Sequence, residues 1–292
     1  MHSFLRAIGF SSIQNRNQLD NLLGQVMNAP TMKNSYPAGN KQTYTEFRRD
    51  FAEGIGLAIR GEYDAYGFFH LEHYFPYFIG PLVTAKEDVM IHKRVDTDAF
   101  TAMCDDYRLG ISLIFYLINS VDYLQSKTRQ SDGRIAPVTL SALSTSGMIL
   151  LPVTKPKTRG KNITDFGRRT KLIAEAKAGN QEAMDNLALD EIDLYANISR
   201  RARVEDLYTI VDTTFIPYGT ESDNYSIIGT ILNWKLVTNR FSGEEVYQLQ
   251  ISCNDLVFAI CIAKADLLGE PMIGRRFKGT VWMQGQVDFT EL

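Results

Sequence analysis

His70-Leu71-Glu72-His73 is the one cluster in the sequence whose side chains have the chemistry of metal ligands. On a strand, His70 and Glu72 would share a face because side chains alternate, and His73 would point away. His92 lies on a second predicted strand. If the two strands face each other, His70, Glu72 and His92 are candidate ligands of a divalent metal. The alternative is an ordinary amphipathic strand whose histidines are hydrogen-bonded.

The elements that would position these side chains form two βαβββ-like halves within residues 1–154. In the first half we expect a strand over Phe4–Phe10, a helix over Leu19–Met27, and strands over residues 47–60 and 68–78.

In the second half, a strand over residues 88–95 leads into a long helix over Phe100–Val121, whose apolar residues recur at helical spacing. A hairpin over residues 137–153 follows, with its turn at Ser144–Gly147. Paired halves of this kind are similar in architecture to glyoxalase-type vicinal-oxygen-chelate proteins, which bind a divalent metal in a cleft.

The rest of the chain divides into a basic linker and helical connector, residues 155–221, and a tail, residues 222–292. In the connector we expect helices over residues 163–178 and 190–202 and a strand over residues 207–216. Four short alternating segments in the tail predict antiparallel strands: Tyr225–Trp234, Glu245–Ser252, Val257–Ala263 and Phe277–Gln284. Their length and spacing are typical of a small barrel of the oligonucleotide-binding type. The predicted class is therefore α+β, with a mixed sheet, a long packed helix and a C-terminal barrel.

Composition is that of a globular protein, with 45% apolar residues and a net charge of −3 in 292 residues. We find no basic region followed by a long apolar stretch, so we expect no signal peptide and no membrane span. The three cysteines (Cys104, Cys253, Cys261) cannot all pair, which fits a reducing cytoplasm.

Positive charge is concentrated in residues 155–177, which hold eight Lys or Arg against two acidic residues. Such a segment could grip phosphates or nucleic acid, and a solvated linker has the same composition. Gly274–Gly279 lacks the ending of a phosphate-binding loop, so we interpret its glycines as turns or kinks. Eight aromatics between Tyr63 and Phe78 indicate either a binding pocket or, as we favour, core packing.

Several short segments resemble an uncharacterised bacterial family that is catalogued only as a domain of unknown function. They are His2–Phe10, Gly179–Ala183, Ile198–Arg201, Ile216–Gly219, Gly243–Tyr247, Gly269–Pro271, Gly274–Gly279 and Trp282–Gly285. The resemblance is clearest from Ala176 onward and extends over the whole chain. It implies no activity, cofactor or site.

The sequence therefore favours a non-catalytic binding or scaffold protein of the cytoplasm with a protein partner. One alternative is a metal-binding protein or enzyme that uses His70, Glu72 and His92. A second is a nucleic-acid-associated factor that works through residues 155–177.

Overall fold

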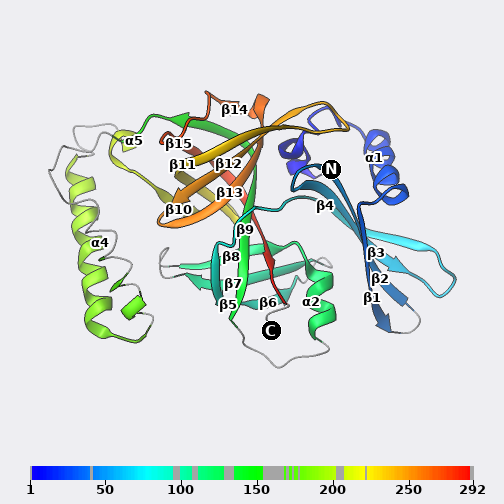
Figure 1. Ribbon diagram of the computed structural model, residues 1–292, viewed down its shortest axis with the longest axis horizontal. Coiled ribbons are helices and arrows are strands. Elements are labelled where there is room, and N and C mark those ends of the chain that lie inside the picture. The colour runs from blue at the N-terminus through cyan, green and yellow to red at the C-terminus, as the bar shows by residue number, and fades with distance from the viewer. Residues whose placement is uncertain are drawn as a thin grey trace.

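The architecture is mostly β, built from a small sheet and a large mixed sheet (Figure 1). The computed structural model describes residues 2–39, 42–94, 99–106, 111–127, 135–153, 168, 171–172, 174–176, 178–201, 207–220 and 222–289. The prediction of an α+β class with a long packed helix is therefore wrong.

The small sheet is antiparallel and has the order β1-β2-β3-β4. Its strands are β1 (Met32–Gly39), β2 (Gln42–Ala52), β3 (Ile55–Tyr63) and β4 (Phe69–Phe78). Helix α1 (Arg16–Asn28) packs on it through Leu22 and Val26, and starts with a capping box between Asn15 and Gln18. The sequence prediction of this helix and of strands β2 to β4 is confirmed.

Phe4–Phe10 is not a strand, because residues Ser3–Ile8 form the 3-10 helix η1. Leu5 and Ile8 are both buried, and a spacing of three residues places them on one face of a 3-10 helix. Gly9 ends the helix with a φ of 84°, a left-handed conformation that glycine adopts without strain.

The large sheet has eleven strands among the described residues, in the order β10-β11-β12-β13-β9-β15-β8-β7-β6, with β5 and β14 paired to β9. Five strands come from the first half of the chain: β5 (Ala85–Asp88), β6 (Met90–Lys93), β7 (Phe100–Asp106), β8 (Ile111–Leu117) and β9 (Ile135–Leu150). The others are β10 (Thr214–Pro217), β11 (Asn224–Thr238), β12 (Glu245–Cys253), β13 (Leu256–Ala263), β14 (Leu267–Leu268) and β15 (Arg276–Val287).

The tail strands lie where the sequence predicted them, yet they do not form a separate barrel. Strand β9 lies between β13 and β15, parallel to the first and antiparallel to the second. Strand β11 pairs with both β12 and β15, so the pairing order β9-β15-β11-β12-β13 returns to β9. The first half of the chain therefore contributes a strand to the centre of the predicted C-terminal module.

The predicted long helix over Phe100–Val121 is instead strands β7 and β8, followed by the short helix α2 (Ser120–Lys127). Leu113 and Phe115 point into one core, and Tyr116 points into another. A strand buried on both faces shows no polar alternation, so its apolar residues can match a helical spacing by chance. Its β-branched and aromatic residues favour the strand.

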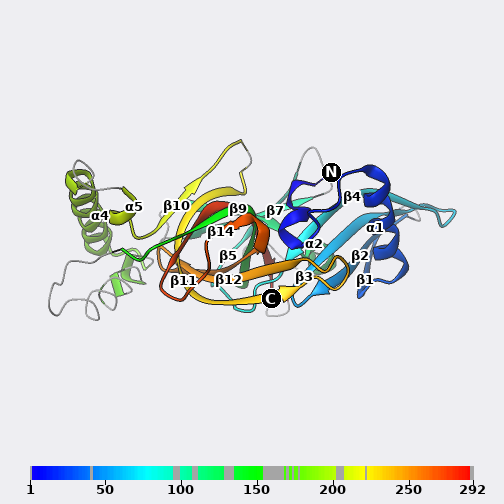
Figure 2. The ribbon, with the colours of Figure 1, turned by 90° about the horizontal axis from the view of Figure 1, so that it is seen from above.

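The predicted hairpin over residues 137–153 is also wrong, because β9 runs through Ser144–Gly147 as one strand. The segment Leu207–Ile216 is divided between the short helix α5 (Leu207–Ile210) and β10. The helix predicted over residues 190–202 belongs to the longer α4 (Gln181–Arg201), which stands apart from both sheets at one end of the molecule (Figure 2). The helix predicted over residues 163–178 lies largely outside the described residues.

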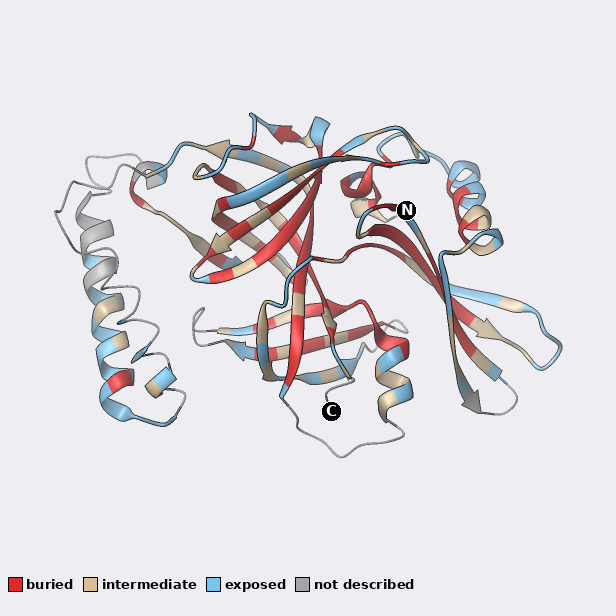
Figure 3. Ribbon diagram, viewed as in Figure 1, coloured by how far each residue is buried: buried red, intermediate tan, exposed pale blue. Residues whose placement is uncertain are grey.

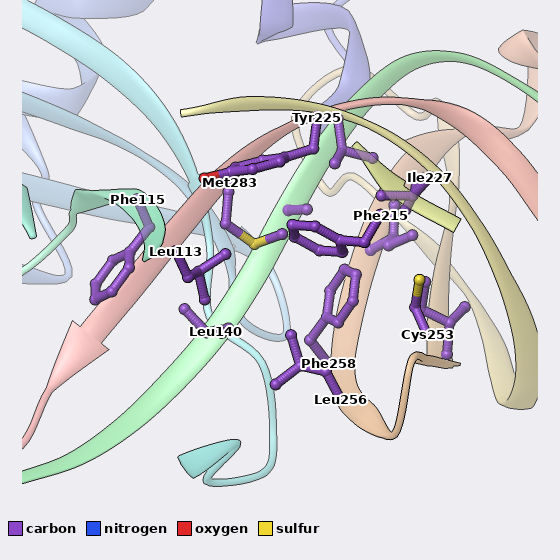
Figure 4. Packing of buried hydrophobic residues seen from close by; sticks show 14 of the residues in the cluster. Leu113, Phe115, Leu140, Phe215, Tyr225, Ile227, Cys253, Leu256, Phe258 and Met283 are labelled. Atoms are coloured by element: carbon purple, nitrogen blue, oxygen red, sulfur yellow. The ribbon is translucent and has the colours of Figure 1, made fainter. Parts of the chain in front are cut away.

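Two apolar cores hold the sheets together. One fills the ring of strands β9, β15, β11, β12 and β13 and includes Phe258, Phe277 and Met283 (Figure 4). The other lies between the outside of that ring, η1, α1 and the small sheet, and includes Phe51 and Trp282. Strands β8, β9, β13 and β15 contribute buried residues to both cores, and each of them contains a run of buried residues (Figure 3). No described helix is long and apolar enough to cross a membrane.

Candidate functional site

The three predicted metal ligands lie on different sheets. His70 and Glu72 are exposed on β4 of the small sheet, and His92 is exposed on β6 at an edge of the large sheet. His70 Nε2 lies 2.9 Å from Asp64 Oδ2, in the turn that precedes β4. Among the described residues, no group of three or more His, Cys, Asp or Glu could hold a metal ion. The structure thus gives no geometric support to a metal centre at these residues.

The aromatic segment from Tyr63 to Phe78 divides into two parts. Phe75, Tyr77 and Phe78 are buried and pack in the core of the small sheet. Tyr66 and Phe68 are 87% and 68% exposed at the turn between β3 and β4. Core packing therefore explains the second part of the segment, and the first part is a surface turn.

The strongest charge cluster in the described chain lies between the two sheets. Arg48 Nε donates to Glu46 at 2.5 Å, and Arg60 Nε donates to the other oxygen of the same carboxylate. Both arginines also donate to the carbonyl of Ile118, where β8 ends. Arg60 Nη1 donates to the hydroxyl of Tyr116 at 3.3 Å.

This buried cluster, Glu46, Arg48 and Arg60 with Tyr116, has strongly perturbed acidities. Burial alone would raise the pKa of Glu46, but the charges of Arg60 and Arg48 outweigh it and hold that pKa below its usual range. Burial raises the pKa of Tyr116 to about 12. Perturbed groups often mark functional sites, but here one carboxylate and the Ile118 carbonyl are shared by both guanidiniums, and these bonds join the small sheet to β8. We interpret the cluster as a structural element that holds the small sheet against β8.

His2 and Trp282 pack against each other at the same interface between the two sheets. Trp282 Nε1 donates to Asp223 at 3.0 Å, and Arg94 donates to the same carboxylate oxygen at 3.1 Å. The ring of His2 lies 5.0 Å from that of Trp282, and its burial lowers the pKa of His2 to about 4. His2 is therefore neutral at pH 7.

A groove of about 440 Å³ lies on the outer surface of the ring of strands. Its polar side chains are Ser146 of β9, Ser226 of β11, and Lys278 and Thr280 of β15, and Asp266 of η2 (Lys264–Asp266) stands on one wall. We refer to it below as the β15 groove. Its volume is in the range that small-molecule sites occupy.

Strand register explains why these polar side chains meet. Thr280 pairs directly with Ser226, and Lys278 lies two residues before Thr280 on the same face of β15. Paired residues on antiparallel strands have Cβ atoms about 5 Å apart, and diagonal neighbours are about 7–8 Å apart. One small ligand can therefore reach all three side chains.

Two glycines form the floor of the groove at positions where no larger side chain would fit. Gly147 and Gly279 pair across β9 and β15, and the ring of Phe277 fills the space beneath them inside the core. A Cβ atom at Gly147 would lie 2.4 Å from that ring, and one at Gly279 would lie 2.7 Å from it. Because neither position has room for a side chain, the aromatic core approaches the sheet closely at this point.

The two charged groups of the groove already have protein partners. Lys278 donates to the hydroxyl of Tyr208 at 2.5 Å, and its ammonium lies 4.2 Å from the centre of the same ring. Asp266 accepts two hydrogen bonds from Arg6 of η1. None of the hydroxyls of Ser146, Ser226 and Thr280 is hydrogen-bonded to another described residue.

A second hollow of about 350 Å³ lies beside α2, and two of its polar residues, Asn119 and Asp122, bond to neighbouring elements. There Asn119 donates to Asp122 at 3.2 Å and to the carbonyl of Val287 at 2.9 Å. Asp122 also accepts a hydrogen bond from Asn34 at 3.0 Å. These bonds tie α2 to β1 and to the end of β15, so we assign this hollow a packing role.

The sequence analysis missed the β15 groove, although it singled out the segment that carries Lys278. Gly274 does lie in a turn, with a φ of 83°, as interpreted from Gly274–Gly279. Gly279, however, lies within strand β15. The alternation of Arg276, Lys278 and Thr280 was the available signal, and it could not indicate which distant strands lie beside β15.

Comparison with known proteins gives one match. The family model described as "Domain of unknown function, E. rectale Gene description (DUF3881)" matches residues 5–285. No curated protein and no solved structure matches the chain. The match spans nearly the whole chain and confirms the resemblance seen in the sequence. The protein is therefore a member of this family of unknown function.

Proposed function

We propose that the chain is a non-catalytic binding protein and that its ligand occupies the β15 groove. One observation carries this proposal: the hydroxyls of Ser146, Ser226 and Thr280 line the groove without a hydrogen bond to another described residue. Polar groups that converge on a hollow of this volume are what orients a small ligand in a binding site.

The same groups argue for binding over catalysis. A general acid or base must be free to exchange a proton with the substrate. Lys278 and Asp266 are the titratable residues among those that line the groove. The Asp266 carboxylate is paired with Arg6, which leaves no free carboxylate among the lining residues to act as a general base. The hydroxyls of serine and threonine need an adjacent base to become nucleophiles, and neither His nor Cys lines the groove.

The partners expected from the sequence stay predictions. A protein partner has support from α4, where Leu189 and Ile192 are 60% and 63% exposed on a helix that stands apart from the sheets. The basic segment proposed to bind nucleic acid, residues 155–177, lies largely outside the described residues.

A groove-filling substitution tests the proposal. Ser226→Phe places a large ring in the groove, and Thr238→Phe, on the exposed end of the same strand, is the matched control. Saturation-transfer NMR would screen both variants and the unmodified protein against amino acids, sugars, organic acids and phosphorylated metabolites. We expect at least one compound to bind the unmodified protein and the control, and to lose its signal with Ser226→Phe.

Two results would count against a ligand site in the groove. One is a screen in which none of these compound classes binds the unmodified protein. The other is a ligand whose signal is undiminished by Ser226→Phe, which would place its site elsewhere.

A further inference from the structure

The charge balance of the β15 groove selects the kind of ligand it can hold. The carboxylate of Asp266 is neutralised by the guanidinium of Arg6 through two hydrogen bonds. The ammonium of Lys278 has a neutral partner, the hydroxyl of Tyr208, so its charge is not compensated there. The groove therefore presents one net positive charge together with three hydroxyl groups.

The ammonium of Lys278 also keeps hydrogen-bonding capacity. A lysine ammonium has three N–H donors, and the bond to Tyr208 uses one. Thr280 and Ser226 lie on the same face, one of them two residues along β15 and the other directly across on β11. Their hydroxyls add two more donors, so a ligand with several acceptor oxygens would meet donors on more than one side.

Tyr208 is held from two sides, which fixes the position of Lys278. The guanidinium of Arg276 is 2% exposed and donates to the carbonyls of Tyr208 and Val211 in and after α5, and to Leu151 after β9. Lys278 then packs its ammonium over the ring of Tyr208. A flexible lysine normally loses side-chain entropy when it binds a ligand, and a lysine held in place loses less.

We infer that the β15 groove binds an oxyanion, either a free phosphate or the phosphoryl group of a small metabolite, through Lys278, Thr280 and Ser226. Lys278 supplies the charge, the two hydroxyls supply directed hydrogen bonds, and Tyr208 positions the ammonium. This inference rests on the proposed function and specifies the ligand of the same groove.

The experiment uses inorganic phosphate as the probe, potassium chloride at equal ionic strength as the salt control and glycerol as the neutral polyol. Titrations are followed by the amide resonances of Gly147 and Gly279 at the groove floor. We expect saturable shifts with phosphate and none with chloride. Lys278→Met should weaken phosphate binding about tenfold or more, because a charge-assisted hydrogen bond is lost.

Further variants separate the chemistry from folding. Lys278→Arg keeps the charge and should retain affinity to within about threefold, whereas Tyr208→Phe keeps the ring and should weaken binding about two- to fivefold through poorer positioning. Glycerol 3-phosphate in place of inorganic phosphate shows whether the groove prefers a free or an esterified phosphoryl group. Lys235→Met on β11, which removes a lysine paired with Glu53, is the control and should leave phosphate binding unchanged.

The possible failures are distinguishable. Phosphate that acts no differently from chloride, or that binds equally well to Lys278→Met, overturns the oxyanion inference. If glycerol shifts the groove resonances in that case, the proposed binding function stands and the ligand class changes. If neither probe perturbs the groove and the wider screen is also negative, both proposals fall.

Discussion

Two sites in the described part of the chain hold cationic side chains and differ in how completely the donors of these side chains are used. Between the sheets, Arg48 and Arg60 share Glu46 and the Ile118 carbonyl, and Arg60 has no exposed surface. In the β15 groove, Lys278 is partly exposed and has one neutral partner, Tyr208.

This contrast separates architecture from binding. A buried charge without a partner costs several kcal/mol, so an interior cluster is stable only when its charges and donors are satisfied by the protein itself. A surface groove has water as an alternative partner, so donors can stay available until a ligand replaces the water. Perturbed pKa values therefore point to the closed cluster, and unused donors point to the groove.

The largest loss of stability is expected from breaking the buried cluster of Glu46, Arg48 and Arg60. Glu46→Met leaves the guanidiniums of Arg48 and Arg60 buried without their shared carboxylate and should lower the free energy of unfolding by about 3–5 kcal/mol, the range for breaking a buried ion pair. Urea denaturation measures it. Lys278→Met, the matched change in the groove, should cost less than about 1 kcal/mol because its charge is solvated. Equal losses in the two variants would erase the distinction between the clusters.

The groove floor gives the next effect. Gly147→Ala places a methyl group 2.4 Å from the Phe277 ring and should destabilise the fold by about 1–3 kcal/mol, as overpacking does. Ser146→Ala, one residue earlier on the groove side, should change stability by less than about 0.5 kcal/mol. Adding Phe277→Leu to Gly147→Ala should recover part of the loss relative to Phe277→Leu alone. Thermal unfolding of the four variants tests this. If the ring and the methyl group do not collide, the effects of Gly147→Ala and Phe277→Leu on stability will add.

Acid should weaken the interface at His2. The folded pKa of His2 is about 4 and its ordinary value is 6.5, so the unfolded chain binds more protons between these values. Stability should fall by up to about 3 kcal/mol as the pH drops from 6.5 to 4. His2→Gln should flatten that part of a denaturation series, and an unchanged slope would assign the effect to other groups.

Protonation of Glu46 also destabilises the protein, but at a lower pH than protonation of His2. Its folded pKa lies below its ordinary value of 4.5, so its stabilising contribution is complete above that pH and is lost as the pH falls through the folded pKa. We therefore expect Glu46→Gln to be less stable than the unmodified protein. This difference in the free energy of unfolding should shrink as the pH falls below 4.5.

The smallest effect concerns the link between the groove and α5. Tyr208→Phe removes the hydrogen bond to Lys278 and keeps the bond from Arg276 to the Tyr208 carbonyl. Hydrogen exchange of the amides in α5 (Leu207–Ile210) should rise a few-fold, with less than about 0.5 kcal/mol change in global stability. Unchanged exchange would mean that the bond between Lys278 and Tyr208 does not help to hold this helix.

Local patterns in the sequence identified elements that are bounded by clear capping or turn residues. Helix α1 shows a capping residue and a regular apolar stripe, and strands β11 to β13 and β15 lie close to their predicted ranges. Strand β8 failed because both of its faces are buried, which removes the alternation that distinguishes a strand from a helix.

Long-range pairing was the information that the sequence pattern lacked. The polar residues Ser144 and Ser146 looked like a turn, but Ser144 is buried and donates to the carbonyl of Thr280 on a strand far along the chain. The β15 groove depends on the same pairing, because Ser146, Ser226 and Thr280 come from three strands. Alternation tells which side chains share a face of one strand and leaves open which strand lies next to it.

The position of β9 between two strands from the end of the chain affects how the protein folds during synthesis. Its neighbours β13 and β15 are made last, and Val138 pairs with Val287 near the end of the chain. While the chain emerges from the ribosome, β5 can pair with the start of this strand, but the rest of both edges awaits partners that do not yet exist, and contacts of such high sequence separation form slowly. Premature termination anywhere before β15 would release a nascent polypeptide with an open β template, a substrate for chaperones or for aggregation.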